Sequence, residues 1–314
     1  MDAPRVVDIF AGCGGFGFGF AEHGFRIGHA VEAFRTSLET YVANVPVDEP
    51  RLGDVRAQPY AKFGRPDVLI GGPPCEAFTV ANADRRKNPL DRLYTDPVGS
   101  LTLQYAKVVK ELQPRVFVME NVPPIMDGPL EAELRMVFAR QGYPDIHFNR
   151  LQAEDFGTPS HRDRVFISNV VISPPKSARR VTVEEAIADL QSLDVEVPNH
   201  EEIPMRGKRG QRMKEMSEGD SLYQYRAADG RMHGAYTRLR ANELAPTVKG
   251  LGRFIHPVED RLLTAREHAR LMGYPDDFVF HGSKNEQLNM IGESVPPPLS
   301  KAIAGEVRAA LDSS

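Results

Sequence analysis

The sequence contains few of the features that mark secreted, membrane-spanning or disulfide-rich proteins. Only two of its 314 residues are cysteine, Cys13 and Cys75, so it has no disulfide framework and we expect a reducing, cytoplasmic environment. No uncharged apolar stretch approaches the roughly 18 residues that a membrane span needs. Residues 1–5 lead directly into an apolar segment, without the charged, apolar and small-residue pattern of a secretory leader.

Strong overall charge is also missing. The chain has 39 Lys and Arg against 43 Asp and Glu, a net charge of −4, which argues against a protein that coats nucleic acid by bulk attraction. The balance is different between Met205 and Arg240, where nine basic residues face four acidic ones. With 41% hydrophobic and 26% charged residues the chain is globular, and its length suggests one large domain or two modest ones.

Short apolar runs alternate with helical segments in the first half of the chain. Strands are predicted at residues 5–10, 27–31, 67–70, 116–119 and 164–172, and an amphipathic helix at 100–112. Continuous β-branched runs of this kind indicate a parallel sheet buried on both faces. After Pro174 and Pro175 the chain becomes polar and basic. We therefore predict an α/β domain formed by residues 1–174 and 284–314, and a smaller domain over 175–283.

A glycine-rich segment follows the first predicted strand. Gly12, Gly14 and Gly17 have the Gly-x-Gly-x-x-Gly spacing, and Glu32 ends the next strand, 20 residues after Gly12. Glycines let the backbone approach a ligand closely, and the carboxylate could bind ribose hydroxyls. By itself this pattern fits a nicotinamide dehydrogenase, or a tight turn without a ligand. Asp54, after another predicted strand, could bind an adenine amino group or cap a helix.

Chemically reactive side chains lie at the ends of three other predicted strands: two follow a strand, and a pair stands at the start of one. Cys75 comes after the strand at 67–70 and is preceded by Gly-Gly-Pro-Pro, a rigid approach that favours a nucleophile over a buried packing cysteine. Glu120 follows the strand at 116–119. Arg162 and Arg164 stand two apart before the strand at 164–172, a spacing that puts them on one side of an extended segment. The alternative for these charges is a surface salt-bridge cluster.

Together these segments resemble the motifs of the cytosine-5 DNA methyltransferases of prokaryotes and phages, in that family's order. Asp8–Gly12 is similar to the S-adenosylmethionine loop, Pro74-Cys75 to the catalytic Pro-Cys, and Glu120–Val122 to the Glu-Asn-Val motif. Arg162 and Arg164 are similar to the paired arginines, and residues 266–276 and 291–296 to two late motifs. The resemblance implies a Rossmann-like S-adenosylmethionine-dependent methyltransferase domain with a smaller target-recognition domain.

The resemblance also implies roles for the candidate catalytic residues. The thiolate of Cys75 would add to C6 of a cytosine flipped out of the duplex, so that C5 can attack a methyl donor. Glu120 would protonate N3 or donate a hydrogen bond to it. Arg164 would hold O2, and Arg162 would steady the same site or the sugar-phosphate.

The cofactor-binding residues are implied in the same way. Phe10 would pack on the adenine, Gly12 and Gly14 would lie against the methionine part, Glu32 would bind the ribose, and Asp54 the adenine. The other implied contacts are Asp8, Ala11, Gly15, Val55, Gly72, Pro74, Glu293, Ser294 and Val295. We expect no metal site.

Two basic segments are candidates for contact with double-stranded DNA. Residues 82–92 correspond to the mobile loop that closes on DNA in the family, with Arg85, Arg86 and Lys87 as contacts. The target-recognition contacts would be Arg206, Lys208, Arg209, Arg212, Arg238 and Arg240. The alternative for both segments is an ordinary solvated surface. No Cys-Phe-Thr tripeptide follows Glu120–Val122, which favours DNA over RNA as substrate. We expect a monomer, and leave open a companion restriction endonuclease that acts on the same site.

Two positions depart from the family pattern. Ser160 stands where the family usually has Gln, and Glu293 stands where it usually has Asn, near the methionine end of the donor. Three alternatives follow: an ordinary enzyme with a local compensation, a weakened or silent relative, or an enzyme that prefers a donor with a more cationic or altered side group.

Overall fold

The structure is a computed structural model that describes residues 3–192, 196–250 and 253–313. The chain divides into two compact units. Unit 1 comprises Met1–Leu151, Asp163–Pro175 and Ser300–Ser314, and unit 2 comprises Gln152–Arg162 and Lys176–Leu299. The predicted boundary after residue 174 lies one residue before the change from unit 1 to unit 2, which follows Pro175. Two segments lie on the other side of the predicted boundaries, because residues 152–162 and 284–299 both pack in unit 2.

Unit 1 contains a seven-stranded sheet in the order β3-β2-β1-β4-β5-β7-β6. The strands are β1 (Arg5–Ile9), β2 (Arg26–Glu32), β3 (Val47–Leu52), β4 (Val68–Gly71), β5 (Val116–Asn121), β6 (His147–Gln152) and β7 (Asp163–Ser168). β1 to β5 pair in parallel, as predicted, whereas β7 runs antiparallel to β5. This is a Rossmann-like, doubly wound α/β sheet.

The last predicted strand is shorter than expected. β7 ends at Ser168 rather than at residue 172. The side chain of Asn169 then takes over the pairing, because its Oδ1 accepts a hydrogen bond from the Phe117 amide and its Nδ2 donates to the Arg115 carbonyl. The hydrogen bonding between β7 and β5 therefore ends with the side chain of Asn169, and an apolar run in the sequence does not reveal where this happens.

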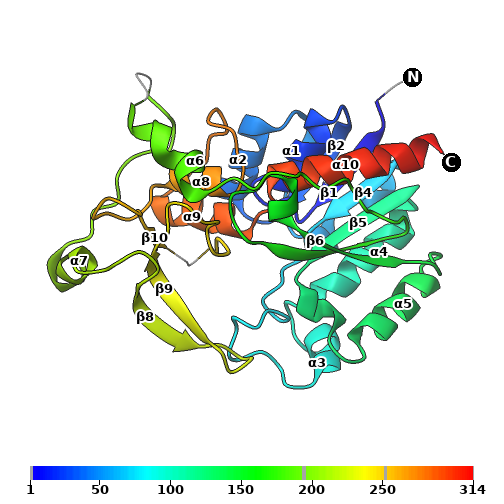
Figure 1. Cartoon of the computed structure of the whole chain (residues 1–314). Helices are drawn as coiled ribbons and strands as arrows, with labels where there is room; N and C mark the ends of the chain where they lie inside the picture. Colours follow the sequence, from blue (N-terminus) through cyan, green and yellow to red (C-terminus); the bar gives the residue numbers. More distant parts are fainter. Residues whose placement is uncertain (1–2, 193–195, 251–252, 314) are drawn as a thin grey trace. The chain divides into compact units, whose positions relative to one another are not determined.

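Helices cover both faces of this sheet (Figure 1). One face carries α1 (Gly15–Glu22), α2 (Arg35–Asn44) and α10 (Pro297–Asp312), and the other carries α4 (Leu101–Leu112) and α5 (Leu130–Arg140). On the first face the Ser300 hydroxyl donates to the Phe16 carbonyl, which fixes α10 against α1. On the second face Phe117 of β5 stacks on Phe138 of α5 with ring centroids 4.8 Å apart. The sheet is thus buried on both sides, as its apolar strands predicted.

The described residues of unit 2 form a small sheet and four α-helices. The sheet has the order β10-β9-β8, formed by β8 (Ser221–Arg226), β9 (Met232–Arg238) and β10 (Phe254–Ile255). The helices are α6 (Val183–Ile187), α7 (Gly207–Lys214), α8 (Ala265–Leu271) and α9 (Lys284–Glu293). Thr264 and Glu267 form a capping box at the start of α8. Arg266, which is fully buried, donates to the carbonyls of Pro198, Pro275 and Phe278.

The remaining helical segments are short. Unit 1 also contains α3 (Pro89–Tyr94) and three 3-10 turns, at Val55–Ala57, Tyr60–Lys62 and Pro123–Met126. Unit 2 contains 3-10 turns at Ala153–Phe156 and Ala188–Ser192. Among the residues that the structure describes, no helix has the length and apolar character needed to cross a membrane.

Candidate active site

The chemistry-bearing residues of unit 1 gather at one edge of the large sheet. Because β1, β2, β4 and β5 are parallel, their carboxyl ends lie at the same edge, which is where α/β sheets hold their ligands. β7 runs the other way, so its first residues reach that edge too. The edge therefore collects Phe10, Glu32, Cys75, Glu120 and Arg164, as the sequence predicted.

The glycine-rich loop is bound to the end of β2. The Ala11 amide donates to the Val31 carbonyl (3.1 Å), and the Gly12 amide donates to Oε2 of Glu32 (2.8 Å). Phe10 and Gly12 both have left-handed backbone conformations, with φ of 55° and 56°. A Cβ at Gly12 would meet no atom within 4 Å, so the space beside the loop is open there. This open cradle next to a carboxylate suits a ligand that comes close to the backbone.

Glu32 is held firmly at this place. Its side chain is buried, and Oε1 accepts a hydrogen bond from the Phe34 amide (2.9 Å) while Oε2 is bonded to Gly12. Burial raises the pKa of Glu32, although the backbone hydrogen bonds oppose this effect. Three backbone amides, those of Gly12, Ala33 and Phe34, donate to a carboxylate that has about four lone-pair sites, so the side chain can still accept a hydroxyl donor from a ligand.

Two apolar side chains at this edge were not singled out in the sequence. Phe34, just before α2, is 73% exposed, and Leu52, which pairs with Glu32 in the sheet, is 42% exposed. Large apolar side chains left open beside a buried carboxylate offer a surface for a flat ring. The position of Phe34, two residues after the glutamate that ends the strand, is the sequence feature that could have indicated this surface.

Asp54 acts as a helix cap, which was one of its two predicted roles. Its carboxylate accepts a hydrogen bond from the Arg56 amide (2.8 Å) at the start of the 3-10 turn Val55–Ala57. Hydrogen bonds from Arg56 hold the pKa of Asp54 below its ordinary value, so it is ionised. Val55 is buried beside it. A contact of either residue with adenine stays a prediction.

Asp8 lies beneath the glycine-rich loop, in the core. It is completely buried, and the Tyr41 hydroxyl donates to its Oδ2 (3.1 Å). No hydrogen-bond partner for Oδ1 is found in the described part of the chain. Burial raises the pKa of Asp8 to about 8. A Cβ on Gly17 would collide with this pair, so α1 can approach it only through a glycine. These contacts support the loop, and direct contact of Asp8, Ala11, Gly14 or Gly15 with a cofactor stays a prediction.

The loop that carries Cys75 is bound to the end of β5. Nδ2 of Asn121 donates to the Pro73 carbonyl (3.2 Å), and a Cβ at Gly72 would lie 3.1 Å from Oε2 of Glu120. The amides of Phe78 and Thr79 both donate to the Cys75 carbonyl at 2.9 Å, which closes a turn immediately after the cysteine. Cys75 is half-buried against the core. Asn121 is thus a positioning residue, for which no role was predicted from the sequence.

Glu120 and Arg164 form an ion pair at the same edge. Nε of Arg164 lies 2.8 Å from Oε1 of Glu120, and the two side chains are only 13% and 11% exposed. A mostly buried pair of this kind holds both groups in one orientation. The edge therefore presents a thiol loop, an acid and a guanidinium, the groups that the sequence predicted together.

Arg162 has partners in unit 2 instead. Its guanidinium, which is almost fully buried, donates to the carbonyls of Val248 and Gly292, both at 3.0 Å. Arg162 precedes the strand, which begins at Asp163, and its partners differ from those of Arg164, which pairs with Glu120. These contacts hold segments of unit 2 together. A role for Arg162 beside the target base stays a prediction.

Both departures from the family pattern also lie in unit 2. Ser160 is buried, and its hydroxyl donates to the Leu271 carbonyl (2.7 Å). Glu293 is exposed at the end of α9, close enough to Gly250 that a Cβ there would lie 2.8 Å from its Oε1. The Ser294 hydroxyl donates to the Ile291 carbonyl, and Val295 is buried. Cofactor contacts of these three residues remain predictions.

The segment after Cys75 is organised by two arginines. Arg92 is buried and donates to the carbonyls of Arg86 (2.7 Å) and Lys87 (3.3 Å), and to Asp127 (3.4 Å). Arg85 donates to the Phe78 carbonyl (2.7 Å) and is only 13% exposed. Arg86 and Lys87 are exposed. Of the three predicted DNA contacts in this loop, Arg85 therefore binds within the loop itself, whereas the other two are open to solvent.

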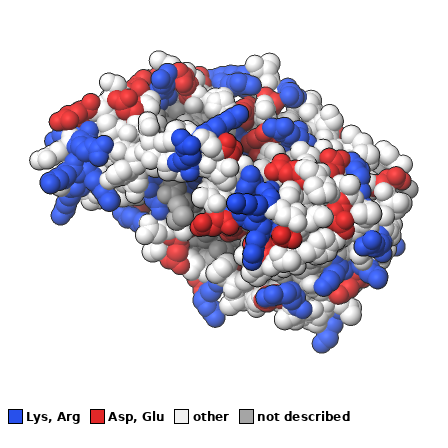
Figure 2. Space-filling view, turned by 90° about the horizontal axis from the view of Figure 1, so that it is seen from below, with Lys and Arg blue, Asp and Glu red and all other residues white. Residues whose placement is uncertain are grey.

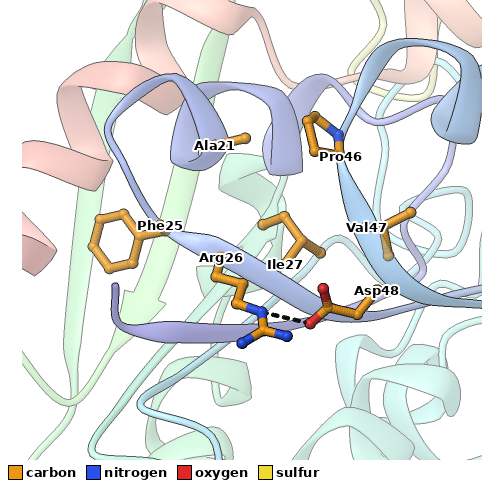
Figure 3. Close-up of a pocket in the computed structure, with 7 residues that line it drawn as sticks. All are labelled: Ala21, Phe25, Arg26, Ile27, Pro46, Val47 and Asp48. Carbon is orange, nitrogen blue, oxygen red and sulfur yellow. Dashed lines mark hydrogen bonds and ion pairs between the residues drawn. The ribbon is translucent and has the colours of Figure 1, made fainter. Parts of the chain in front are cut away.

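A surface hollow of about 480 Å³ lies away from this edge. It is found where β2 and β3 begin, the end of these strands opposite Glu32 (Figure 3). An ion pair between Arg26 and Asp48 crosses it (2.8 Å), and the other lining residues are apolar. It carries none of the predicted site residues.

Known proteins show the same pattern over the whole chain. The family described as "C-5 cytosine-specific DNA methylase" matches residues 4–309. The chain is 46% identical to the "Putative type II methyltransferase M.MJ0563P" of Methanocaldococcus jannaschii, covering 97% of this chain and 99% of that protein. It is 33% identical to the "Type II methyltransferase M1.HphI" of Haemophilus parahaemolyticus, covering 96% and 86%.

A solved structure agrees with these sequence relatives. The protein titled "putative DNA modification methyltransferase encoded within prophage", from E. coli, superimposes with a TM-score of 0.74 at 25% identity, covering 99% of this chain and 100% of that one. The expected fold is confirmed, and the comparisons favour a methyltransferase over the nicotinamide dehydrogenase that the glycine spacing alone allowed.

Proposed function

The chain belongs to the C-5 cytosine-specific DNA methylases, a family of methyltransferases, and from this premise we propose that it methylates C5 of cytosine in double-stranded DNA with S-adenosylmethionine as donor. One observation carries the proposal. Asn121 binds the Cys75 loop to the strand end that bears Glu120, and Glu120 is paired with Arg164. A nucleophile, an acid and a cation are thereby held at one sheet edge.

The residues at the end of β2 fit the adenosyl part of the donor. The carboxylate of Glu32 can accept hydrogen bonds from ribose hydroxyls, and the open space at Gly12 lets the chain of the donor lie against the backbone. Phe34 and Leu52 provide apolar surface for the adenine. When bound, S-adenosylmethionine supplies an electrophilic methyl group.

The residues of the chain then act on the cytosine. The thiolate of Cys75 forms a bond to C6, and the ring electrons move toward N3 and O2. Glu120 donates a proton or a hydrogen bond to N3, and Arg164 balances the charge at O2 while it keeps Glu120 in place. C5 becomes nucleophilic, and the bound donor would supply its methyl group to C5 and leave as S-adenosylhomocysteine. Loss of the C5 proton to water and cleavage of the carbon–sulfur bond release Cys75.

The substrate and setting follow from the relatives. Two of them are named type II methyltransferases, which belong to restriction–modification systems, so we propose a companion endonuclease that cuts the same site when it is unmethylated. A base inside a duplex must be flipped out, at a cost of roughly a few kcal/mol. Arg86 and Lys87, in the loop after Cys75, are exposed, which supports the proposal that they contact the opened DNA.

Bisulfite sequencing tests the proposal. DNA from a host without cytosine methylation that expresses the chain should contain 5-methylcytosine at one fixed short sequence, and Cys75→Ser should abolish it. Bisulfite sequencing of RNA from the same cells separates an RNA substrate from a DNA substrate. If neither nucleic acid is methylated by the wild type, or if Cys75→Ser methylates equally, the proposal is wrong.

The purified protein tests the donor. S-adenosylmethionine should bind to the wild type and much more weakly to Glu32→Ala. Glu293→Asn, which restores the usual family residue, separates the three alternatives for that position: unchanged affinity and turnover indicate an ordinary enzyme, higher turnover a weakened one, and a changed donor preference an altered donor.

A further inference from the structure

The Cys75 loop is bound on both sides of the cysteine. Before it, Nδ2 of Asn121 donates to the Pro73 carbonyl (3.2 Å). After it, Nη1 of Arg85 donates to the carbonyl of Phe78 (2.7 Å), the residue whose amide is bonded to the Cys75 carbonyl. The turn that carries the thiol is therefore fixed at its start and at its end.

Asp127 faces two guanidinium groups at once. It follows the 3-10 turn Pro123–Met126, and its Oδ2 lies 3.4 Å from Nη1 of Arg92 and 3.9 Å from Nη1 of Arg85. Burial and the charge of Arg85 lower the pKa of Arg92, and Asp127 opposes this effect. One carboxylate thus balances two guanidinium groups that would otherwise repel each other.

Arg92 carries the contact into the loop. Its side chain is only 6% exposed, and its Nε and Nη2 donate to the carbonyls of Arg86 (2.7 Å) and Lys87 (3.3 Å). A Cβ on Gly99 would collide with both the Arg92 carbonyl and Ala77, so no side chain fits between α3 and the turn after the thiol. The loop and α3 therefore pack as one piece, and Asp127 binds this piece to the segment that follows β5.

Charge alone does not distinguish these residues. Figure 2, in which the molecule is seen from below, shows acidic and basic side chains mixed over much of the surface. An ordinary ion pair of unit 1 joins Arg135 to Glu131 on α5 at 2.8 Å, with side chains 45% and 41% exposed. Arg85 and Arg92 are only 13% and 6% exposed, and each donates to carbonyls of the loop as well. Their burial indicates that they position the chain.

The same criterion separates the predicted DNA contacts of unit 2. Arg238 is buried, pairs with Asp260 (2.6 Å) and donates to the Met213 carbonyl (2.8 Å), so it supports the core of that unit. Arg240 is exposed and pairs with Glu243 (3.1 Å). A buried guanidinium that is bound to carbonyls of its own chain holds those carbonyls in place and is not open to a phosphate.

We propose that Asp127 is a positioning residue for the nucleophile. Through Arg85 and Arg92 it holds the loop after Cys75, so that the thiol stays at the sheet edge that bears Glu120. The chain after β5 then fixes the loop on both sides, and a misplacement of reacting groups by about 1 Å can cost on the order of 10²-fold in rate. This inference rests on the proposed function, which makes Cys75 the nucleophile. It replaces the DNA contact expected for Arg85 by a contact within the protein.

Single-turnover methyl transfer at saturating DNA and donor tests the positioning. Asp127→Ala should lower the rate by about 10–100-fold, and the affinity for S-adenosylmethionine should not change, because the cradle at Gly12 and Glu32 is untouched. Asp127→Glu keeps the carboxylate and should recover most of the rate. Glu131→Gln is the matched control, because it breaks an ion pair of similar exposure on α5, and it should methylate like the wild type. A wild-type rate in Asp127→Ala overturns the proposal.

Limited digestion with trypsin measures the loop without nucleic acid or donor. Trypsin cleaves after arginine and lysine, and the carbonyls that Arg92 binds belong to two such peptide bonds, those after Arg86 and Lys87. Cleavage requires that the loop opens locally, so Asp127→Ala should be cut there several-fold faster than the wild type, and Glu131→Gln at the wild-type rate. Mass spectrometry identifies the cut bonds. An unchanged rate in Asp127→Ala would show that this carboxylate does not hold the loop.

Arg85 tests the path of the effect. If Asp127 acts through Arg85, the double variant Asp127→Ala/Arg85→Gln should be no slower than the slower single variant, because the same contact is lost only once. Losses that multiply would refute this path. Arg85→Gln also separates positioning from DNA contact: a positioning residue lowers kcat at saturating DNA, whereas a phosphate contact raises KM for DNA and depends on salt. A raised KM with an unchanged kcat would overturn the role given to Arg85.

The variants also keep this proposal separate from the proposed function. The Asp127 side chain is 47% exposed, so its variants should fold, and Asp127→Asn, which removes the charge and keeps the shape, should show a smaller loss in the same direction. A wild type that transfers no methyl group, together with faster cleavage of Asp127→Ala, would refute the function and leave Asp127 as the residue that holds the loop. A wild type that methylates DNA, together with Asp127→Ala at the same rate, would refute the positioning and leave the function intact.

Discussion

The guanidinium of Arg164 and the carboxylate of Glu120 lie 2.8 Å apart and join β7 to β5. The pairing depends on the direction of β7: because that strand is antiparallel to β5, its first residues lie beside the last residues of β5. With Asn121 bonded to Pro73, the same strand end also fixes the Cys75 loop. Three separate segments are thus aligned by one strand end.

Glu120→Gln should reduce methyl transfer far more than stability. The amide can still accept a hydrogen bond from Arg164, but the mostly buried guanidinium loses its counter-charge, so we expect a moderate fall in the thermal unfolding midpoint. It cannot donate a proton as an acid, and general acid catalysis is typically worth about 10²–10⁴-fold. Single-turnover methyl transfer at saturating DNA measures the loss. A variant with wild-type turnover would show that Glu120 is not the acid.

The two arginines should respond differently to substitution. Arg162→Gln removes a buried charged donor to two carbonyls, and we expect a loss of about 2–4 kcal/mol in the free energy of unfolding. Arg164→Lys keeps the charge but not the Nε geometry, so turnover should fall while stability is nearly retained. Urea denaturation and steady-state kinetics are measured on both variants. An Arg162 variant that is stable but inactive would support the predicted catalytic role instead.

The buried Asp8 should make stability depend on pH. Burial raises its pKa from 3.8 to about 8, so the folded protein holds a proton that the unfolded chain releases between these values. The free energy of unfolding therefore falls as pH rises through this window. Asp8→Asn is neutral at every pH and lacks this contribution, so its stability relative to the wild type should increase from about pH 5 to about pH 8. Urea denaturation at several pH values measures the difference, and parallel profiles would contradict it.

Substitution of Gly17 by alanine should affect stability, whereas substitution of Gly12 should affect ligand binding. A Cβ at Gly17 would collide with the Tyr41–Asp8 pair, so Gly17→Ala should cost about 1–3 kcal/mol of stability through overpacking. A Cβ at Gly12 meets open space, and only the left-handed backbone opposes it, at about 1–2 kcal/mol. Gly12→Ala should instead weaken S-adenosylmethionine binding, because the methyl group projects into the open space beside the loop. Calorimetric binding distinguishes the two, and equal affinity in Gly12→Ala and the wild type would refute the cradle.

The buried part of the fold could be predicted because burial on both faces leaves a clear signal. β1, β2, β4 and β5 are continuous apolar runs, and each begins and ends within two residues of its predicted bounds. The edge strands are different. β3 carries Asp48, Glu49 and Pro50 with most of its side chains exposed, and β6 is half-exposed, so neither has an apolar run. Only the end of β3 was predicted.

The candidate site was predictable where it depends on strand ends and not where it depends on long-range contacts. Cys75, Glu120 and Arg164 were placed correctly at one edge because parallel strands end together. The separation of Arg162 from Arg164 depends on where β7 begins and on carbonyls at Val248 and Gly292, which no local pattern records. The same limit applies to Arg238, whose partner Asp260 is distant in sequence.

The hydrogen bonds of Arg162 also bear on how unit 2 could be exchanged between relatives. The chain enters unit 2 twice, once for Gln152–Arg162 and once for Lys176–Leu299. The short passage is bonded into the long one through Val248 and Gly292. If recombination replaced only the long passage, Arg162 would have to bind carbonyl groups from a different protein. We therefore expect that an exchange of unit 2 between relatives keeps its stability only if both passages are moved together.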